Sequence, residues 1–247
     1  MPIVTTDAQP TTTSADLAYR ELREAILTGH VSAGEVMSQV QLAAQMQISR
    51  TPLREAVRRL EAEGLLSSES NRRVRVSELT LQDLDEVYGQ RLALEPLALH
   101  LSVPRLNRED LRTVHQALET STTALRAGDM DLFHEHHRTL HLGVVSRVGP
   151  RLFRTICDLW DHAERYRRVF LVDDEDHSRV ENSIRDHEEL VAAAEARDTV
   201  RCAEVLTRHL STTALTIFDF YGGPERPDMI NTVLHRNGDG SGGPPHD

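Results

Sequence analysis

Four histidines in this chain have spacings that would allow them to bind one metal ion. His137 and His141 are four residues apart, so on a helix they share one side and lie about 6 Å from each other. His187 lies eleven residues before Asp198, and His209 lies eleven residues after it. If two antiparallel helices meet at Asp198, both side chains lie at the same height, about 16 Å from the turn. Imidazole nitrogens suit zinc, nickel, iron or copper rather than magnesium or calcium.

The surrounding segment HEHHRTLH, residues 134–141, contains two further histidines. On a helix, His134 could lie beside the metal site, whereas His136 is rotated by about 100° from His137 and is expected to face solvent. Arg138 stands where the H-E-x-x-H motif of zinc proteases needs its second histidine. Four histidine ligands would also leave no open position on the ion, so we expect no enzyme activity; a metalloenzyme remains a remote alternative. The simplest alternative is a metal-free pocket with ordinary core or surface histidines.

A second group of residues has the chemistry and spacing for contacting nucleic acid. Arg50, Arg54 and Arg58 are spaced by four, so on a helix they form one stripe. A guanidinium group can donate two parallel hydrogen bonds to guanine or to phosphate. The other candidates are polar residues at the start of that helix and in a nearby turn: Ser49, Thr51, Asn71, Arg72 and Arg73. The alternative is a solvated arginine face without a partner.

The charge distribution supports a local rather than a general affinity for polyanions. The net charge of the chain is −11, which argues against the whole molecule binding nucleic acid. Residues 50–75, however, contain seven arginines and four glutamates.

The N-terminal elements that would position these arginines form a recognisable pattern. Helical periodicity starts at Ser14 and stops at Gly29, and a short helix follows Ser38. The next helix ends at Gly64, and alternating residues around a turn at Ser70-Asn71 indicate a small hairpin. Helix, helix–turn–helix and hairpin describe a winged helix-turn-helix, in which the second helix of the pair enters the DNA major groove.

The rest of the chain is predicted to be an antiparallel all-α bundle, which makes the fold class mainly α. The expected helices are 81–102, 108–127, 130–147, 151–172, 178–196 and 199–221. We therefore predict a disordered N-terminus (1–14), a winged helix-turn-helix domain (15–78), a helical domain (79–222) and a flexible tail (223–247). Neither a signal peptide nor a membrane span is indicated, and Cys157 and Cys202 suggest no disulfide framework, so we expect a cytoplasmic protein.

Residues 23–76, and above all SRTPLREAVRRLEAEGLL, resemble the DNA-binding domain of the GntR family of bacterial transcriptional regulators. The resemblance implies that Ser49, Arg50, Thr51, Arg54 and the hairpin tip around Asn71–Arg73 contact DNA. Relatives usually have glycine at the tip position that Arg73 occupies here.

The helical part resembles the FCD effector domain of the FadR-type subfamily, in its six-helix, VanR-like branch. The resemblance runs from LQDLDEVYGQRLALEPLALHLS to RDHEELVAAAEARDTVRCAEVLTRHL. It implies a metal site in which His137 stands where relatives have aspartate. Four neutral imidazoles leave such a site about one unit more positive, which favours an anionic ligand. Arg91 is the candidate cation for a carboxylate, with Arg165 and Arg168 as weaker candidates; an ion pair of Arg91 with Glu95 is the alternative.

These resemblances imply a homodimeric transcription factor, most simply a repressor. It would read a pseudo-palindromic operator in double-stranded DNA, and a small carboxylate bound near the metal would control its affinity. The alternative is a regulator that senses the metal, or is only stabilised by it, without an organic effector.

Overall fold

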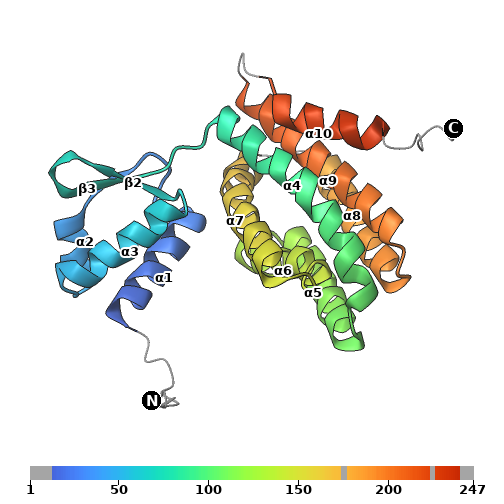
Figure 1. Cartoon of the computed structure of the whole chain (residues 1–247), viewed down its shortest axis with the longest axis horizontal. Coiled ribbons are helices and arrows are strands. Elements are labelled where there is room, and N and C mark those ends of the chain that lie inside the picture. The colour runs from blue at the N-terminus through green and yellow to red at the C-terminus, as the bar shows by residue number, and fades with distance from the viewer. Residues whose placement is uncertain (1–12, 174–176, 223–225, 240–247) are drawn as a thin grey trace, which may run out of the picture. The chain divides into compact units, whose positions relative to one another are not determined.

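The computed structural model describes residues 13–173, 177–222 and 226–239 (Figure 1). The chain divides into two compact units, Met1–Leu79 and Thr80–Asp247, one residue from the predicted domain boundary. Each unit is described by itself. We expected residues 1–14 to be disordered. Residues 1–12 lie outside the described residues, and Thr13 and Ser14 begin the first helix.

Three helices form the described helical part of the N-terminal unit: α1 (Ser14–Leu27), α2 (Gln39–Gln45) and α3 (Arg50–Ala62). Thr13 caps α1, because its hydroxyl accepts a hydrogen bond from the Asp16 amide while the Asp16 carboxylate accepts one from the Thr13 amide. The apolar stripe of α3 consists of Leu53, Val57 and Leu60, of which none is more than 3% exposed.

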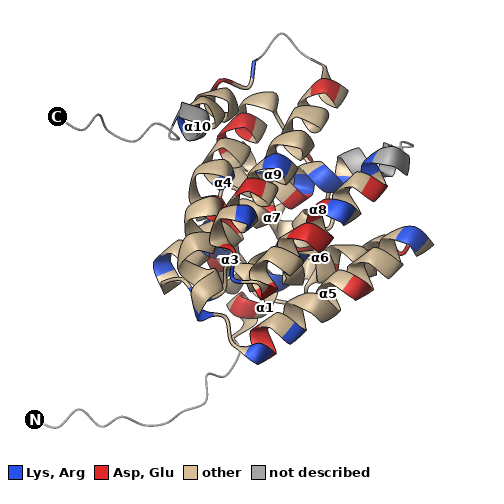
Figure 2. Ribbon diagram, turned by 90° about the vertical axis from the view of Figure 1, so that its right-hand side faces the viewer, with Lys and Arg blue, Asp and Glu red and all other residues tan. Residues whose placement is uncertain are grey.

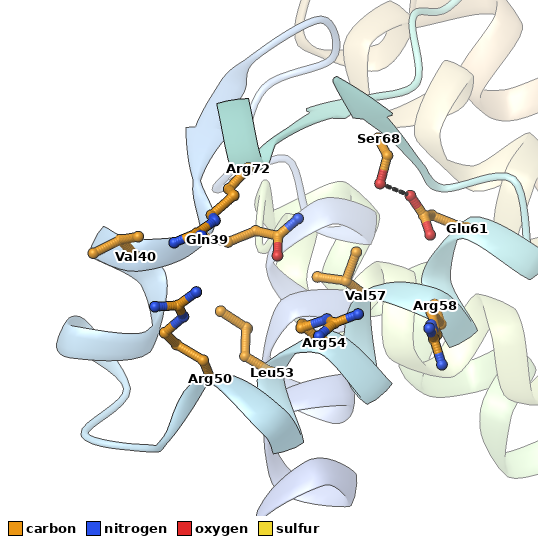
Figure 3. Close-up of a pocket in the computed structure, with 10 residues that line it drawn as sticks. All are labelled: Gln39, Val40, Arg50, Leu53, Arg54, Val57, Arg58, Glu61, Ser68 and Arg72. Atoms are coloured by element: carbon orange, nitrogen blue, oxygen red, sulfur yellow. Dashed lines mark hydrogen bonds between the residues drawn. The ribbon is translucent and has the colours of Figure 1, made fainter. Parts of the chain in front are cut away.

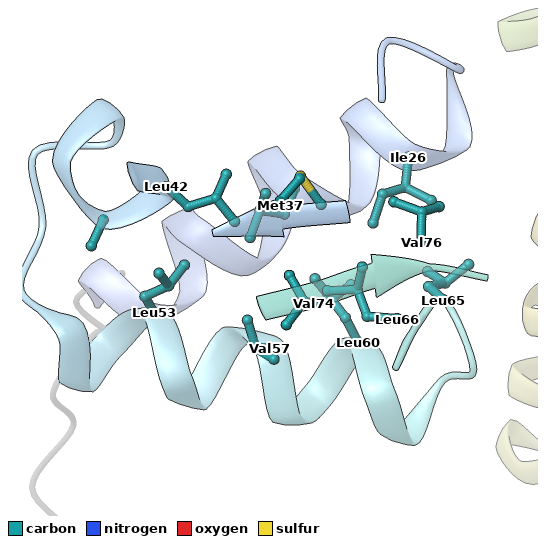
Figure 4. Packing of buried hydrophobic residues seen from close by; sticks show 12 residues of the cluster. Ile26, Met37, Leu42, Leu53, Val57, Leu60, Leu65, Leu66, Val74 and Val76 are labelled. Carbon is teal, nitrogen blue, oxygen red and sulfur yellow. The ribbon is translucent and has the colours of Figure 1, made fainter. Parts of the chain in front are cut away.

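A small antiparallel sheet packs on α3. Its strands are β1 (Val36–Ser38), β2 (Leu66–Glu69) and β3 (Arg73–Val76), in the order β1-β3-β2. Leu66 pairs with Val76 and Glu69 with Arg73, which confirms the predicted hairpin, whereas β1 was not predicted. Figure 4 shows the buried side chains of the sheet, including Val74, facing those of α3.

The hairpin tip is a short helical turn, η1 (Ser70–Arg72). Asn71 and Arg72 have φ angles of 60° and 59°, in the left-handed region that asparagine tolerates better than most residues. Arg73 has an extended backbone, with φ −101° and ψ 159°. The conformation at Arg73 therefore does not require a glycine.

The described part of the C-terminal unit is entirely helical. Its elements are α4 (Leu81–Ser102), η2 (Val103–Arg105), α5 (Arg108–Ala127), α6 (Met130–Val144), α7 (Pro150–Asp173), α8 (His177–Glu195), α9 (Thr199–Tyr221) and α10 (Asp228–Asp239). The expected fold class, mainly α with a winged helix-turn-helix and a helical domain, is confirmed.

Helix α4 is the central element of this unit. It contacts α7, α9 and α10, and Figure 1 shows it running alongside α9. Leu84, Tyr88, Leu92 and Leu99 are fully buried and recur at helical spacing, so they form the stripe that packs into the core.

Helix α10 corrects the expectation of a flexible tail. The Asp85 carboxylate of α4 accepts hydrogen bonds from the amides of Met229 (2.8 Å) and Ile230 (2.9 Å), at the start of α10. Ile230 is fully buried. The Met229 side chain packs so closely on Gly89 that a Cβ added to this glycine would lie 2.5 Å from Met229 Cγ. Residues 228–239 are thus a docked helix; residues 223–225 and 240–247 of the predicted tail lie outside the described residues.

The start of α4 is tied to α7. The Tyr166 hydroxyl donates a hydrogen bond to Asp83 Oδ2 (2.7 Å), and the Thr80 amide donates one to the Tyr166 oxygen (3.2 Å). Burial raises the pKa of Tyr166, so its hydroxyl keeps its proton.

Within the described ranges no helix is both long and apolar enough to cross a membrane.

Candidate nucleic-acid interface and candidate metal centre

The arginines predicted to contact DNA lie together on one face of the N-terminal unit. Figure 3 shows Arg50, Arg54 and Arg58 following one another along α3, with Arg72 reaching the same groove from the hairpin tip. Gln39 and Val40 of α2 complete the groove. The side chains of Leu53 and Val57 anchor α3 beneath it, so the basic stripe is held on a rigid element.

These arginines differ from Arg59 and Arg75 of the same unit in their surroundings. Arg59 pairs with Asp16 at 2.8 Å, and Arg75 pairs with Glu69 at 2.6 Å. In contrast, Arg50, Arg54 and Arg58 are exposed and make no ion pair with any described residue. A stripe of exposed arginines without acidic partners offers a strong attraction to phosphate groups.

The remaining predicted DNA contacts lie at the two ends of this face. Ser49 is the residue before α3, and its side chain makes no capping hydrogen bond, so the hydroxyl and the helix N-terminus are available to a phosphate. Thr51 is exposed in the first turn. Asn71 and Arg73 are also exposed at the hairpin tip. The structure therefore brings all the predicted contacts to α3 and the hairpin.

The four predicted metal ligands converge in the C-terminal unit. His137 and His141 come from α6, His187 from α8 and His209 from α9, and none is more than 7% exposed. The Nε2 atom of His141 lies 3.0 Å from Nε2 of His137 and 3.1 Å from Nε2 of His187. The Nε2 atoms of His137 and His187 are 3.1 Å apart. One ligand nitrogen from each of the four histidines falls within 4.8 Å of the others.

Ion pairs between α8 and α9 hold two of these histidines in register. Arg208 of α9 binds Asp186 and Glu189 of α8, each at 2.7 Å, and Arg201 of α9 binds Glu189. Figure 2 shows basic and acidic residues close together on these two helices. The neighbouring His187 and His209 therefore lie at the same height, as their spacing from Asp198 predicted.

The protonation state of the cluster suits a transition metal. Burial lowers the pKa of His137, His141 and His187 well below 6.5 and also lowers that of His209, so the imidazoles are neutral at pH 7. A neutral imidazole has one N–H and one lone pair, so three mutually adjacent Nε2 atoms cannot all be satisfied by hydrogen bonds to one another. Zinc bonds of 2.0–2.1 Å would place tetrahedral ligand nitrogens about 3.3 Å apart. The residues present therefore fit a divalent metal.

A carboxylate orients one of the rings. The Asp186 Oδ2 atom lies 3.5 Å from His209 Nδ1, which would keep the proton on Nδ1 and leave Nε2 free for an ion. His134 is buried, and its Nδ1 atom lies 2.5 Å from Oε1 of Glu164, which also binds Arg167. His136 is half-buried and does not belong to the group of four.

The predicted effector cation is engaged elsewhere. Arg91 binds Glu95 at 2.5 Å, and both side chains are buried, which is the alternative that the sequence left open. Arg165 and Arg168 do not line the cavity beside the histidines either. Arg91 as an effector contact stays a prediction.

Sequence reasoning missed Arg167 of α7. Its Nη1 atom lies 2.7 Å from His137 Nδ1, and Glu164 binds the same guanidinium group. Burial lowers the pKa of Arg167 to about 9, so it is still charged at pH 7. Trp160, Glu164 and Arg167 share one side of α7, and this mixture of apolar and charged residues on a buried helix face was the signal available in the sequence.

A cavity of about 280 Å³ opens beside the cluster. His137, His209 and Arg167 form one part of its wall, and Phe133 and Leu125 form an apolar part. Arg179, Asp186 and uncharged residues of α8 and α9 complete it. A buried cation, four clustered histidines and an apolar surface are chemically suited to a small anion.

Comparison with known proteins assigns both parts of the chain. The FCD domain family matches residues 86–212, which contain all four histidines and Arg91. The family described as bacterial regulatory proteins, gntR family, matches residues 15–76, which contain all the predicted DNA contacts. The chain belongs to the GntR family. Helix α10 lies outside both matched ranges.

Individual GntR regulators support this assignment. The chain is 28% identical over 218 residues to the transcriptional repressor GlaR of Escherichia coli, covering 82% of this chain and 94% of that protein. It is 35% identical over 113 residues to an uncharacterized regulator of Bacillus subtilis, YdhC, covering 46% of this chain and half of that protein. The solved structure of McbR from E. coli superposes on this chain with a TM-score of 0.76 at 25% sequence identity. The superposition covers 86% of this chain and 100% of McbR's solved chain.

Proposed function

We propose that this chain is a homodimeric repressor that binds a pseudo-palindromic operator and releases it when a small organic acid binds next to a metal ion in the FCD domain. The similarity to a repressor, GlaR, over most of both chains supports the direction of regulation. The observation that carries the proposal for DNA is the stripe of Arg50, Arg54 and Arg58, which makes no ion pair within the described part of the chain and shares a groove with Arg72.

The stripe has the dimensions for reading a major groove. Side chains spaced by four on α3 lie about 6 Å apart along the helix, and Arg50 and Arg54 are closest to its N-terminal end. Arginines at this end of a recognition helix reach the base edges, while the hydroxyl groups of Ser49 and Thr51 and the hairpin would contact phosphates. Two copies of the chain would occupy successive major grooves.

The ion would be held by His137, His141, His187 and His209, with zinc as the expected metal and nickel, iron or copper as alternatives. When bound, the ion supplies positive charge that attracts an anionic ligand. The protein's own groups add to this attraction, because Arg167 lies against His137 and lines the cavity. Asp186 would orient the His209 ring, and burial would keep all four rings neutral.

An electrophoretic mobility shift assay with DNA from the promoter of the protein's own gene tests the proposal. We expect retardation by the metal-loaded protein and release when a small carboxylate is added. No retardation at low salt, with no gain from added zinc, would rule out operator binding at that promoter.

The buried, all-nitrogen ligand set also favours a second function, a regulator controlled by the metal alone. The same assay separates the two, because DNA release would then follow chelation and not the addition of an acid. If neither chelation nor acid changes DNA affinity, the ion has a structural role only.

A further inference from the structure

The groove that holds the arginine stripe has an exposed apolar surface at one end. Among the described residues that line it, three are apolar: Leu53 and Val57 of α3 are 0% and 3% exposed, whereas Val40 of α2 is 51% exposed. Figure 3 shows Val40 at the end of the groove nearest Arg50. Val40 is therefore the apolar side chain of this groove that a ligand can still cover.

The fold does not depend on the Val40 side chain for packing. Helix α2 packs into the core through Leu42 and Ala43, which are 9% and 5% exposed. Gln39 and Val40, the first two residues of α2, are the ones that line the groove. A substitution at Val40 should therefore act on a ligand in the groove and leave the core of the unit intact.

Positive charges at this end of the groove would bring DNA against Val40. Arg50 approaches from the start of α3 and Arg72 from the hairpin tip, and both line the groove together with Val40 (Figure 3). Arginine side chains attract phosphates and bond the edge of guanine. DNA held by both arginines would lie against the valine beside them and remove its apolar surface from water, which is favourable.

The chemistry of the major groove limits what Val40 can contact there. The start of a recognition helix faces base edges, and Val40 lines the groove alongside the start of α3. Base edges present nitrogen and oxygen atoms and one wholly apolar group, the C5-methyl of thymine. The deoxyribose is the other carbon-rich surface, but oxygens interrupt it and it is the same at every nucleotide. A valine beside arginines that bond guanine therefore fits a thymine methyl best.

We infer that Val40 contacts the C5-methyl group of a thymine next to the guanines that Arg50 and Arg54 bond, so that this residue gives the operator a preference for an A·T pair at that position. The inference rests on the proposed function and adds a base preference to its operator. In a pseudo-palindrome bound by two copies of the chain, this thymine occurs once in each half-site.

Replacement of thymine by deoxyuridine tests the contact directly, because deoxyuridine lacks only the methyl group and pairs with adenine in the same way. The preferred site would first be selected by the zinc-loaded full-length protein from duplexes with a randomised central segment. Each thymine of the selected site would then be replaced in turn by deoxyuridine, in one half-site and in both. Fluorescence anisotropy measures the Kd for each duplex.

At one thymine position, the replacement should weaken binding about fourfold in one half-site and about tenfold or more in both. Val40→Ala should bind the thymine duplex correspondingly less tightly and should no longer distinguish it from the deoxyuridine duplex. Its affinity for DNA of unrelated sequence should stay unchanged, because no phosphate contact is lost. Val36→Ala is the matched control, since Val36 is 36% exposed and lies on β1 outside the groove, and it should behave like the unmodified protein.

The outcomes separate this inference from the proposed function. If the effect of deoxyuridine at every position is the same in Val40→Ala and in the unmodified protein, the inference is wrong. An equal loss of affinity for all sequences in Val40→Ala would also overturn it and would indicate a deoxyribose contact. In both cases the selected site still supports operator binding. If selection yields no preferred sequence, the proposed operator binding fails together with the inference.

Discussion

At the level of single residues, the arginines of the N-terminal unit have two different roles. Arg59 pairs with Asp16 and lies 3.7 Å from the centre of the Tyr19 ring, so it links α3 to α1. Arg54 is five residues earlier on α3, exposed and without an acidic partner among the described residues. The same side-chain type therefore stabilises the domain at one position and is available to a ligand at another.

This difference predicts opposite effects of two substitutions. Arg54→Ala should weaken operator binding by about 1–3 kcal/mol, because it removes a group that can bond a base or phosphate, and should leave thermal stability unchanged. Arg59→Ala is the matched control and should lower the melting temperature with little effect on DNA affinity. Fluorescence anisotropy with labelled operator DNA and differential scanning calorimetry measure the two quantities. Equal DNA affinities of Arg54→Ala and the unmodified protein would show that α3 does not read DNA through this stripe.

The histidine cluster predicts a pH dependence of stability in the metal-free protein. Burial keeps the four pKa values below 6.5 in the folded state, whereas the unfolded chain binds protons at these histidines near pH 6.5. The unfolded state is therefore favoured as the pH falls, and the free energy of unfolding should decrease between pH 7 and pH 5. The decrease is at most about 1.4 kcal/mol per pH unit for each histidine.

Urea denaturation of chelator-treated protein at several pH values measures this decrease. His115, which is exposed and outside the cluster, supplies the control, because His115→Asn should leave the pH dependence unchanged. A free energy of unfolding that stays constant from pH 7 to pH 5 would contradict the neutral, buried state of the cluster.

At the level of elements, the sequence predicted those whose signals are local. The helices 81–102, 108–127 and 199–221 have the predicted bounds, since apolar periodicity and turn residues such as Gly128 mark their ends. β1 was missed because a three-residue strand has too few positions for an alternating pattern. Helix α10 was missed because the Gly, Pro and Asn around it suggest a loop, and its anchor, Asp85, lies more than 140 residues earlier.

In the candidate site, too, the residues with local signals were predicted and those without were missed. The spacing of His137 and His141, and of His187 and His209 around Asp198, was enough to predict that they meet. Arg167 could not be assigned to the site from the sequence. Its place there depends on a contact between two helices, that of Arg167 of α7 with His137 of α6. The spacing of Arg91 and Glu95 allowed an ion pair. The sequence could not show that both side chains are buried together, and this burial favours the ion pair.

The capping of α10 by Asp85 predicts a local loss of stability. Asp85→Ala removes the acceptor for the Met229 and Ile230 amides and should destabilise the docked helix by about 1 kcal/mol. Hydrogen–deuterium exchange should accelerate in residues 228–239 and stay unchanged in α5 and α6. Glu86→Ala, on the exposed side of α4, is the control. Unchanged exchange in α10 after the Asp85 substitution would mean that the helix is held by its apolar contacts alone.

At the level of the whole molecule, the two units should respond differently to metal. All four histidines and Trp160 belong to the C-terminal unit, and the N-terminal unit has its own core around Leu53 and Leu60. Removal of the ion should therefore lower the melting temperature reported by tryptophan fluorescence by several degrees, since binding to the folded state stabilises only this unit.

Thermal unfolding with and without EDTA tests this expectation. The isolated segment 13–79, followed by circular dichroism, is the control and should unfold at the same temperature in both conditions. Identical tryptophan-detected transitions with zinc and with EDTA would show that the cluster holds no ion.

The hydrogen bond between Thr80 and Tyr166 joins the first residue of the C-terminal unit to the wall of its cavity. The Thr80 amide donates to the Tyr166 hydroxyl oxygen, and Thr80 is the residue at which this unit begins. Tyr166 directly precedes Arg167 in α7, and Arg167 lines the cavity beside the histidines. The point at which the chain enters the helical unit is therefore one hydrogen bond and one peptide bond away from a residue of the cavity wall.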